Sequence, residues 1–252
     1  MTADLNGRVA IVTGGGRDIG RAVALAFARR GASVVINYNT SAGQARALVQ
    51  EVTAGGGHAI AVQADVSTTA GAKALVAASV EAFGHRIDFL VNNAGGLVAR
   101  KGLAEMDEGF WDQVFALNAR SVFLVTQAVV PHMHEGSAIV NLSSLAAHDG
   151  GGPGAMAYAA AKGAVLTLTR GLSKELGPKR IRVNCVSPGM IATTFHDTFT
   201  KPEARAATAA RTSVGREGSA EDVANAVLFL ATDASAYING ESLEINGGLY
   251  FV

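Results

Sequence analysis

The sequence predicts an α/β fold in which a central sheet of seven parallel strands is covered by helices on both faces. Short apolar runs rich in β-branched residues recur along the 252 residues, and each is followed by a longer stretch with a helical pattern. This alternation is typical of βαβ units, which bury a parallel sheet on both faces. It does not break between the first strand and the last, so we expect one doubly wound domain over residues 1–252.

The expected elements follow from the same pattern, taken in chain order. The strands are the apolar runs at 9–13, 33–38, 59–64, 87–92, 138–142, 182–186 and 242–245. The helices lie between them at 19–30, 41–54, 69–83, 107–132, 156–176 and 221–231. The segment 189–213 has little β pattern and weak helical signals near 202–212. At about 25 residues it is long enough to serve as a substrate lid.

The composition excludes several classes of partner. Lys and Arg together number 21, as do Asp and Glu, so the sequence predicts no basic surface for nucleic acid or for an anionic membrane. We expect a small-molecule partner instead. Cys185 is the only cysteine, which excludes an intrachain disulfide and fits a reducing compartment. The first seven residues lack the pattern of a leader, and no apolar run approaches the roughly 18 residues of a membrane span, so we expect a cytoplasmic protein.

A glycine-rich turn joins the first expected strand to the first helix. It reads Thr13-Gly14-Gly15-Gly16-Arg17-Asp18-Ile19-Gly20. A turn of this kind lets backbone N–H groups approach a pyrophosphate, and the N-terminus of the following helix adds its positive end. The pattern is also compatible with a plain tight turn. Its place in the first βαβ unit favours a dinucleotide site of the Rossmann type.

Tyr158 and Lys162 stand four residues apart in an alanine-rich helical run, which puts both side chains on one helix face. A phenol with a pKa of about 10 is a poor acid or base near neutrality, but an adjacent ammonium favours the phenolate and lowers that pKa. The pair could therefore act as an acid/base catalyst. The spacing alone also arises by chance.

Four motifs in chain order resemble those of the short-chain dehydrogenase/reductase family. They are the Thr-Gly loop that ends at Gly20, Asn92-Asn93-Ala94-Gly95, Tyr158-x-x-x-Lys162 and Pro188-Gly189. The similarity covers essentially the whole chain. It is closest to members that resemble 3-oxoacyl-(acyl carrier protein) reductase, although sugar, polyol and steroid dehydrogenases share the pattern. The resemblance implies an NAD(P)-dependent oxidoreductase that acts on a ketone or a secondary alcohol, with a 3-oxoacyl thioester among the candidate substrates. It also implies that the protein forms a homotetramer.

The resemblance also implies the cofactor-binding residues, which lie mostly in loops at strand ends. They are Gly14, Arg17, Asp18, Ile19, Gly20, Asn39, Thr40, Ser41, Asp65, Val66, Asn92, Ala94, Gly95, Tyr158, Lys162, Pro188, Gly189, Ile191 and Thr193. The residues after the third and fourth strands would line the adenine and adenosine. Those after the sixth strand would hold the nicotinamide end.

The choice of dinucleotide depends on the end of the second strand. An NAD site needs an acidic group there for the ribose 2′-OH, and residues 37–41 contain none. A 2′-phosphate needs cations and hydroxyls, which Arg17, Asn39, Thr40 and Ser41 can supply. We therefore predict that NADP(H) is favoured over NAD(H). Asp18 stands where the family usually has a glycine, and we predict that its carboxylate points away from the phosphates and hydrogen-bonds locally.

By the same resemblance, the reaction would be carried by Asn118, Ser144, Tyr158 and Lys162. Tyr158 would donate a proton to a carbonyl oxygen as hydride reaches the carbon, and Ser144 would stabilise that oxygen. Lys162 would hold the nicotinamide ribose and tune Tyr158, and Asn118 would hold a water beside Lys162. Ser143 stays open as the alternative to Ser144. Only one of the two can face the site, because neighbours along a strand point to opposite faces, and we favour Ser144.

Other candidates are less favoured. His132 and His134 are two apart on a helix and diverge, so no metal is expected. His148 could touch a substrate or be a solvated loop residue, and Cys185 fits a buried strand position.

Two other classes of protein are alternatives. One is a non-catalytic dinucleotide-binding sensor or structural subunit, and the other is an extended epimerase or dehydratase, which would need a large C-terminal substrate domain. Substrate identity would depend on the loops at 97–103, 145–157 and 190–213.

Overall fold

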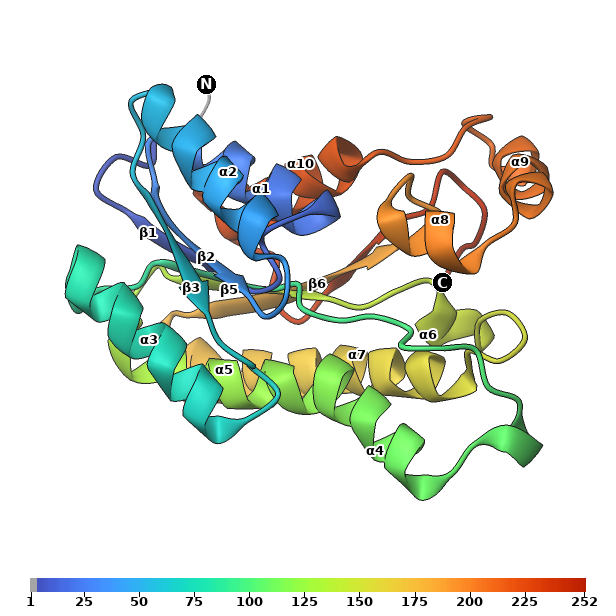
Figure 1. The fold of residues 1–252 in the computed structure, drawn as a ribbon. Coiled ribbons are helices and arrows are strands. Elements are labelled where there is room, and N and C mark those ends of the chain that lie inside the picture. The colour runs from blue at the N-terminus through green and yellow to red at the C-terminus, as the bar shows by residue number, and fades with distance from the viewer. Residues whose placement is uncertain (1–3) are drawn as a thin grey trace.

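A seven-stranded parallel sheet lies between two layers of helices in the computed structural model, which describes residues 4–252 (Figure 1). The first three residues, part of the stretch where no leader is expected, lie outside this range. The strand order is β3-β2-β1-β4-β5-β6-β7. The strands are β1 Val9–Val12, β2 Ser33–Tyr38, β3 Ala59–Gln63, β4 Phe89–Asn92, β5 Ala138–Leu142, β6 Arg182–Pro188 and β7 Ser242–Ile245. The predicted fold class is confirmed.

Ten α-helices within residues 4–252 cover the sheet and shape its edges. They are α1 Asp18–Ala28, α2 Ala42–Ala54, α3 Thr69–Phe83, α4 Glu108–Phe115, α5 Ser121–Val129, α6 Ala146–Asp149, α7 Met156–Leu176, α8 Thr194–Phe199, α9 Pro202–Arg211 and α10 Ala220–Ala231. Short 3₁₀ turns lie at Leu103–Glu105, Val130–His132, Gly177–Lys179 and Asp233–Ser235. The helices α1, α2 and α10 pack on one face, and α3, α5 and α7 on the other (Figure 1).

The helix expected at 107–132 is interrupted by one π-helical turn, Ala116–Arg120, between α4 and α5. The predicted continuous helix did not include this turn, and π-turns are frequent at functional sites. The whole run Glu108–His132 is also long and apolar enough to cross a membrane, contrary to our expectation. Here it packs against the sheet and buries Val114, Val122 and Val125, which is the position of a core helix.

The segment 189–213 contains two short helices, α8 and α9, and α9 confirms the weak helical signals near 202–212. The chain then enters α10 through a capping box. Ser219 Oγ accepts a hydrogen bond from the Asp222 N–H at 3.1 Å, and the Asp222 carboxylate accepts one from the Ser219 N–H at 2.7 Å. These reciprocal bonds satisfy two N–H groups that would otherwise lack partners.

All seven strands point the same way, so the sheet has a carboxyl edge, where the strands end, and an amino edge, where they begin. The order reverses between β1 and β4, which both lead into loops at the carboxyl edge. A crevice opens at such a switch point because the two connections run to opposite faces of the sheet. The fold therefore brings the motifs that follow β1, β4, β5 and β6 to one place.

Candidate active site

The glycine loop after β1 is held open by side chains from the two neighbouring strands. Asn37, buried in β2, accepts a hydrogen bond from the Gly14 N–H at 3.2 Å. Asn93 donates to the carbonyl oxygens of Thr13 and Gly14 at 2.9 and 3.0 Å. A Cβ on Gly20 would lie 2.3 Å from the Gly14 oxygen, so only glycine allows this close turn. The protein's own side chains therefore hold the loop in this conformation.

Asn37 and Asn93 were not among the predicted site residues. An asparagine inside the otherwise apolar strand Ser33–Tyr38 was the available signal, because a buried amide needs partners. Asn92, which was predicted, points elsewhere. Its side chain is buried and donates to Thr126 of α5 and to Asn141 of β5, at 3.1 and 2.9 Å. The amide donor of Asn92 is therefore used within the protein, whereas its buried Oδ1 accepts no hydrogen bond.

The stretch after β4 connects the glycine loop to the catalytic candidates. The Ala94 N–H donates to Thr13 Oγ1 at 3.0 Å. A Cβ on Gly95 would lie 2.7 Å from Asn118 Oδ1 and 3.0 Å from Lys162 Nζ. Gly95 thus leaves the space through which the backbone approaches both side chains, and the structure brings the cofactor motif and the catalytic set together.

Asp18 begins α1 with a left-handed backbone, φ 52°, which is unfavourable for a residue with a Cβ. Its carboxylate accepts hydrogen bonds from the backbone N–H and the hydroxyl of Thr194, at 3.1 and 2.5 Å. Arg17 donates to the same hydroxyl at 2.5 Å. The expectation of a local hydrogen bond is wrong, because Thr194 lies 176 positions along the chain, at the start of α8. The glycine loop and the segment 189–213 are tied together by these contacts.

The remaining cofactor candidates lie around the same edge. Asp65 is exposed and its carboxylate accepts from the Ser67 N–H at 3.0 Å, which shapes the turn before α3, while Val66 is buried. Asn39 and Thr40 are exposed after β2. A Cβ on Gly16 would lie 2.8 Å from Ser41 Oγ, so this hydroxyl closes on the glycine loop.

After β6, Pro188 is the last strand residue, and its carbonyl accepts from the Leu145 N–H at 2.9 Å. A Cβ on Gly189 would lie 2.8 Å from that of Asn246, so glycine is needed there. Ile191 is 2% exposed and packs in the core with the partly buried Ile19, whereas the Thr193 hydroxyl donates to the Ile191 carbonyl at 3.1 Å.

Tyr158 and the two serines occupy distinct positions. Ser144 lies close enough to the Tyr158 hydroxyl to act on its pKa, and Ser144 Oγ accepts a hydrogen bond from the Ala146 N–H at 3.2 Å. Ser143 is buried and donates to the Lys162 carbonyl oxygen of α7 at 2.8 Å. Burial raises the pKa of Tyr158, and the hydrogen bond with Ser144 opposes that rise without cancelling it. The geometry thus favours Ser144 over Ser143 as the residue beside the phenol.

Lys162 is buried, and its ammonium donates to the Leu142 carbonyl oxygen at 2.7 Å. Its Nζ lies 5.8 Å from the centre of the Tyr158 ring. Burial lowers the pKa of Lys162 to about 8, with a smaller opposing effect of Cys185. The expectation that Lys162 lowers the pKa of Tyr158 is wrong in this structure, because the ammonium is directed to Leu142 and is itself poorly stabilised as a cation.

Asn118 lies in the π-helical turn and is fully buried. Its Nδ2 donates to the carbonyls of Gly96 and Val114, both at 2.9 Å, and its Oδ1 accepts from the Gly96 N–H at 2.9 Å. Both amide hydrogens are therefore used by the protein. These bonds fix the loop after β4 against the helix and leave one lone pair of Oδ1 for a further donor.

The other sequence candidates lie outside this group. His134 Nε2 contacts Asp88 at 3.1 Å at the amino edge, and His148 Nε2 contacts Glu244 at 3.1 Å. Burial raises the pKa of Cys185 to about 11. Within residues 4–252 no group of three His, Cys, Asp or Glu is arranged to hold a metal ion.

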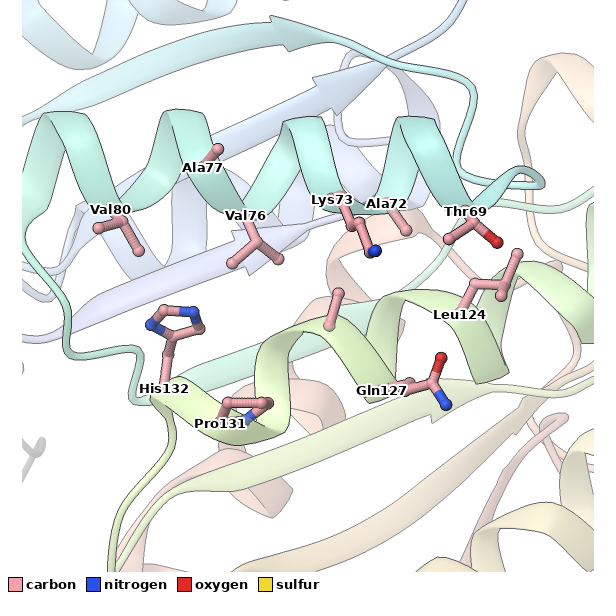
Figure 2. A pocket seen from close by; sticks show the side chains of 11 residues that line it. Thr69, Ala72, Lys73, Val76, Ala77, Val80, Leu124, Gln127, Pro131 and His132 are labelled. Atoms are coloured by element: carbon pink, nitrogen blue, oxygen red, sulfur yellow. The ribbon is translucent and has the colours of Figure 1, made fainter.

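A groove of about 560 Å³ lies between α3 and α5, away from the predicted site residues (Figure 2). It is lined by apolar stems of both helices together with Lys73, Gln127 and His132. None of the predicted catalytic or cofactor residues contributes to it. The groove therefore lies on a different part of the molecule from the candidate active site.

Comparisons with known proteins agree over nearly the whole chain. The model of a family described as Enoyl-(Acyl carrier protein) reductase matches residues 14–250. An uncharacterized oxidoreductase of Methylorubrum extorquens is 42% identical over 247 residues, covering 97% of this chain and 98% of the relative. A 3-oxoacyl-(acyl-carrier-protein) reductase of Staphylococcus aureus is 38% identical over 243 residues, covering 96% and 97%. A solved short chain dehydrogenase of Burkholderia cenocepacia in complex with NADP has a TM-score of 0.91 at 38% identity, covering 98% and 99%.

Fold, site and similarities together define an oxidoreductase that acts on CH–OH groups with a nicotinamide dinucleotide. The chain belongs to the short-chain dehydrogenase/reductase family.

Proposed function

We propose that this protein is an NADP(H)-dependent reductase of ketones, and in reverse a dehydrogenase of secondary alcohols, with Asn118, Ser144, Tyr158 and Lys162 at its centre. One observation carries the proposal: Lys162 Nζ lies 5.8 Å from the centre of the Tyr158 ring, and a Cβ on Gly95 would lie within 3.0 Å of both Lys162 Nζ and Asn118 Oδ1. A binding loop and a proton donor thus share one crevice.

The residues present fit a dinucleotide. Gly14, Gly20 and Gly95 leave backbone open where any Cβ would collide, and the N-terminus of α1 adds its positive end. The glycine loop would hold the pyrophosphate, Asp65 and Val66 the adenine, and Pro188 to Thr193 the nicotinamide end. When bound, the dinucleotide supplies or accepts the hydride.

The protein residues then handle the proton and the charge. Tyr158 donates its hydroxyl proton to the oxygen of the ketone, which becomes a stronger base as hydride reaches the carbon. Ser144 donates a hydrogen bond to the same oxygen and stabilises the charge that grows there. Lys162 is held by Leu142 one helical turn from Tyr158 and would bind the nicotinamide ribose. Asn118 acts as a positioning residue for the loop at Gly96.

Replacing Tyr158 with Phe tests this assignment. Loss of a general acid lowers kcat by about 10² to 10⁴. Because the glycine loop and Lys162 would still hold the dinucleotide in this variant, we expect it to keep NADPH binding, measured by fluorescence titration. Turnover of ketones by Tyr158→Phe at the wild-type rate would contradict the mechanism, and binding without turnover in the wild type would favour a sensor.

The preference for NADP(H) rests on residues 37–41, which offer no carboxylate for a ribose 2′-OH. The Burkholderia cenocepacia relative with NADP bound supports it. Arg17 has a 59% exposed side chain beside the loop, so it can turn from Thr194 toward a 2′-phosphate. Steady-state rates with NADPH and NADH decide the point, and a preference for NADH would overturn it.

We further propose a cytoplasmic homotetramer with a substrate lid at 189–213. The single, buried Cys185 suits a reducing compartment. Trp111 and Phe123 are 37% and 46% exposed on the long helix 108–132, an apolar face that a second copy would cover. Light scattering coupled to size-exclusion chromatography measures the assembly. A 3-oxoacyl thioester, the substrate class in the name of the Staphylococcus aureus relative, belongs in the substrate panel beside simple ketones.

A further inference from the structure

An aromatic wall from α8 covers the catalytic tyrosine. The ring of Phe195 lies 5.9 Å from the ring of Tyr158, tilted by 42°. The ring of Phe199 packs edge-on against Phe195 at 5.3 Å. Val98 and Ala99, from the loop after β4, belong to the same apolar cluster as Tyr158. The phenol that would meet the carbonyl is therefore surrounded by aromatic and aliphatic groups.

The helix that carries this wall is fixed at both ends. At its start, the Thr194 N–H and hydroxyl bond to the Asp18 carboxylate. At its end, Arg100 donates to the Phe199 carbonyl at 3.1 Å and to the Pro153 carbonyl at 2.8 Å. Arg100 thereby joins all three loops in which substrate determinants were expected. Phe195 is positioned without help from a substrate, which lowers the ordering cost of binding against it.

Charged groups near the wall are directed elsewhere. His196 hydrogen-bonds Thr200 at 2.9 Å, and burial, followed by the charge of Arg205, lowers its pKa. Arg205 bonds to the carboxylates of Glu217 and Asp197. Among the described residues, burial and Ser144 alone account for the pKa shift of Tyr158, with no contribution from a charged side chain. An ionic substituent beside the carbonyl would therefore lose its hydration and gain no partner from α8.

From this wall we infer the substrate class: a ketone whose carbonyl is attached to a flat aromatic ring, or the corresponding benzylic alcohol, with Phe195 as the residue that selects it. The inference rests on the proposed function and names the substrate of the same site. A ring held beside Phe195 forms a tilted aromatic pair, whereas a saturated ring of similar size gains only apolar contact. Such pairing favours the aryl substrate about three- to tenfold.

The test uses acetophenone and cyclohexyl methyl ketone, which differ only in the aromaticity of the ring. For the wild type and for Phe195→Leu, kcat/KM is measured with NADPH for both ketones, and the ratio between the ketones is compared across the two proteins. Comparing this ratio between the two proteins cancels the difference in intrinsic reactivity between the two ketones. We expect the ratio of aryl to saturated ketone to fall about three- to tenfold in Phe195→Leu.

Phe83→Leu is the matched control, since Phe83 is a partly buried phenylalanine at the end of α3 and lies away from the wall. The ratio of kcat/KM for the aryl ketone to kcat/KM for the saturated ketone should be the same in Phe83→Leu as in the wild type. An unchanged or increased ratio in Phe195→Leu overturns the inference.

A binding measurement separates failure of the inference from failure of the proposed function. The thermal stabilisation of the protein by 1-phenylethanol and by 1-cyclohexylethanol is measured with NADP⁺ present. If neither ketone is reduced, greater stabilisation by the phenyl compound that disappears in Phe195→Leu still supports the aromatic wall, while the reductase proposal fails. Equal thermal stabilisation by both alcohols would contradict the inference that Phe195 selects an aromatic ring.

Discussion

The two edges of the sheet both carry polar clusters, but they use them in opposite ways. At the amino edge, the Asp88 side chain is 1% exposed and accepts from Arg8 at 2.6 Å and from the Val9 N–H at 2.9 Å. Arg86 and His134 complete the cluster, at 3.4 and 3.1 Å. At the carboxyl edge, Tyr158 is half-buried, and among the described residues only Ser144 acts to lower the pKa of its hydroxyl. The buried carboxylate of the amino edge therefore has several partners, whereas the phenol of the carboxyl edge has few.

The pKa values express this difference. Burial alone would raise the pKa of Asp88, but hydrogen bonds from Arg8 and Val9 and the charges of Arg8 and His134 outweigh it and lower the pKa. At the carboxyl edge burial prevails, because it raises the pKa of Tyr158 and lowers that of Lys162 to about 8. Partners stabilise the ionised form at one edge, whereas burial disfavours ionised forms at the other. We interpret the first cluster as structural and the second as functional.

Removing Asp88 should have the largest effect on stability. Asp88→Ala leaves the buried Val9 N–H without an acceptor, which costs about 1–3 kcal/mol, and the loss of the pair with Arg8, whose side chain is 40% exposed, adds less. Urea unfolding measures the loss, and Asp88→Asn, which keeps an acceptor for Val9, should lose less. Because Asp88 lies at the amino edge, kcat/KM of the folded variant should stay at the wild-type value. A fall in kcat/KM at constant stability would contradict the division between the edges.

The two serines give the sharpest test at the carboxyl edge. Ser144→Ala removes the hydroxyl that contacts Tyr158, and loss of one donor to a developing oxyanion costs about 10² to 10³ in kcat. Ser143→Ala is the matched control, because its hydroxyl donates to the Lys162 carbonyl and its loss should act mainly on stability. Steady-state kinetics of both variants decide between them. Should Ser143→Ala lose more activity than Ser144→Ala, the assignment is reversed.

Lys162 should make stability rise with pH. The unfolded lysine keeps its proton up to about pH 10.5, whereas the folded one releases it above about pH 8. The unfolded state therefore binds more protons in this window, and the unfolding free energy should increase by about 1 kcal/mol between pH 8 and pH 9. The window stops at pH 9 because Cys185, whose pKa burial raises from 9.0 to about 11, acts in the opposite direction above it. Chemical unfolding of Lys162→Met should lack the rise, and an equal rise in this variant would exclude Lys162 as its source.

The sequence was sufficient for features that depend on local pattern. Apolar periodicity predicted the strands 33–38, 138–142 and 242–245 with the bounds observed, and sequence motifs singled out the glycine loop and Tyr158 to Lys162 as candidates. It was insufficient where a contact joins distant segments. Neither the π-turn at Asn118 nor the wall made by Phe195 has a local signature, because each depends on which loops meet at the carboxyl edge.

Asp18 shows the same limit of sequence analysis, and its substitutions should have the smallest effect on stability among these predictions. Its partner Thr194 could not be read from the neighbouring sequence, yet the two bonds between them offset a left-handed backbone that glycine would adopt freely. Asp18→Ala keeps the unfavourable backbone and loses both bonds, whereas Asp18→Gly loses the bonds but relieves the backbone. We therefore expect Asp18→Gly to be more stable than Asp18→Ala by about 1 kcal/mol in thermal unfolding.

Asp18→Asn serves as the control, since asparagine tolerates the left-handed region and keeps one acceptor for Thr194. Its stability should lie closest to the wild type. Because the carboxylate is directed to Thr194, its removal should change the affinity for NADPH by less than about tenfold. A greater gain in affinity for Asp18→Gly would mean that the charge acts on the phosphates after all, and the carboxyl edge would then hold an unfavourable charge within its own binding loop.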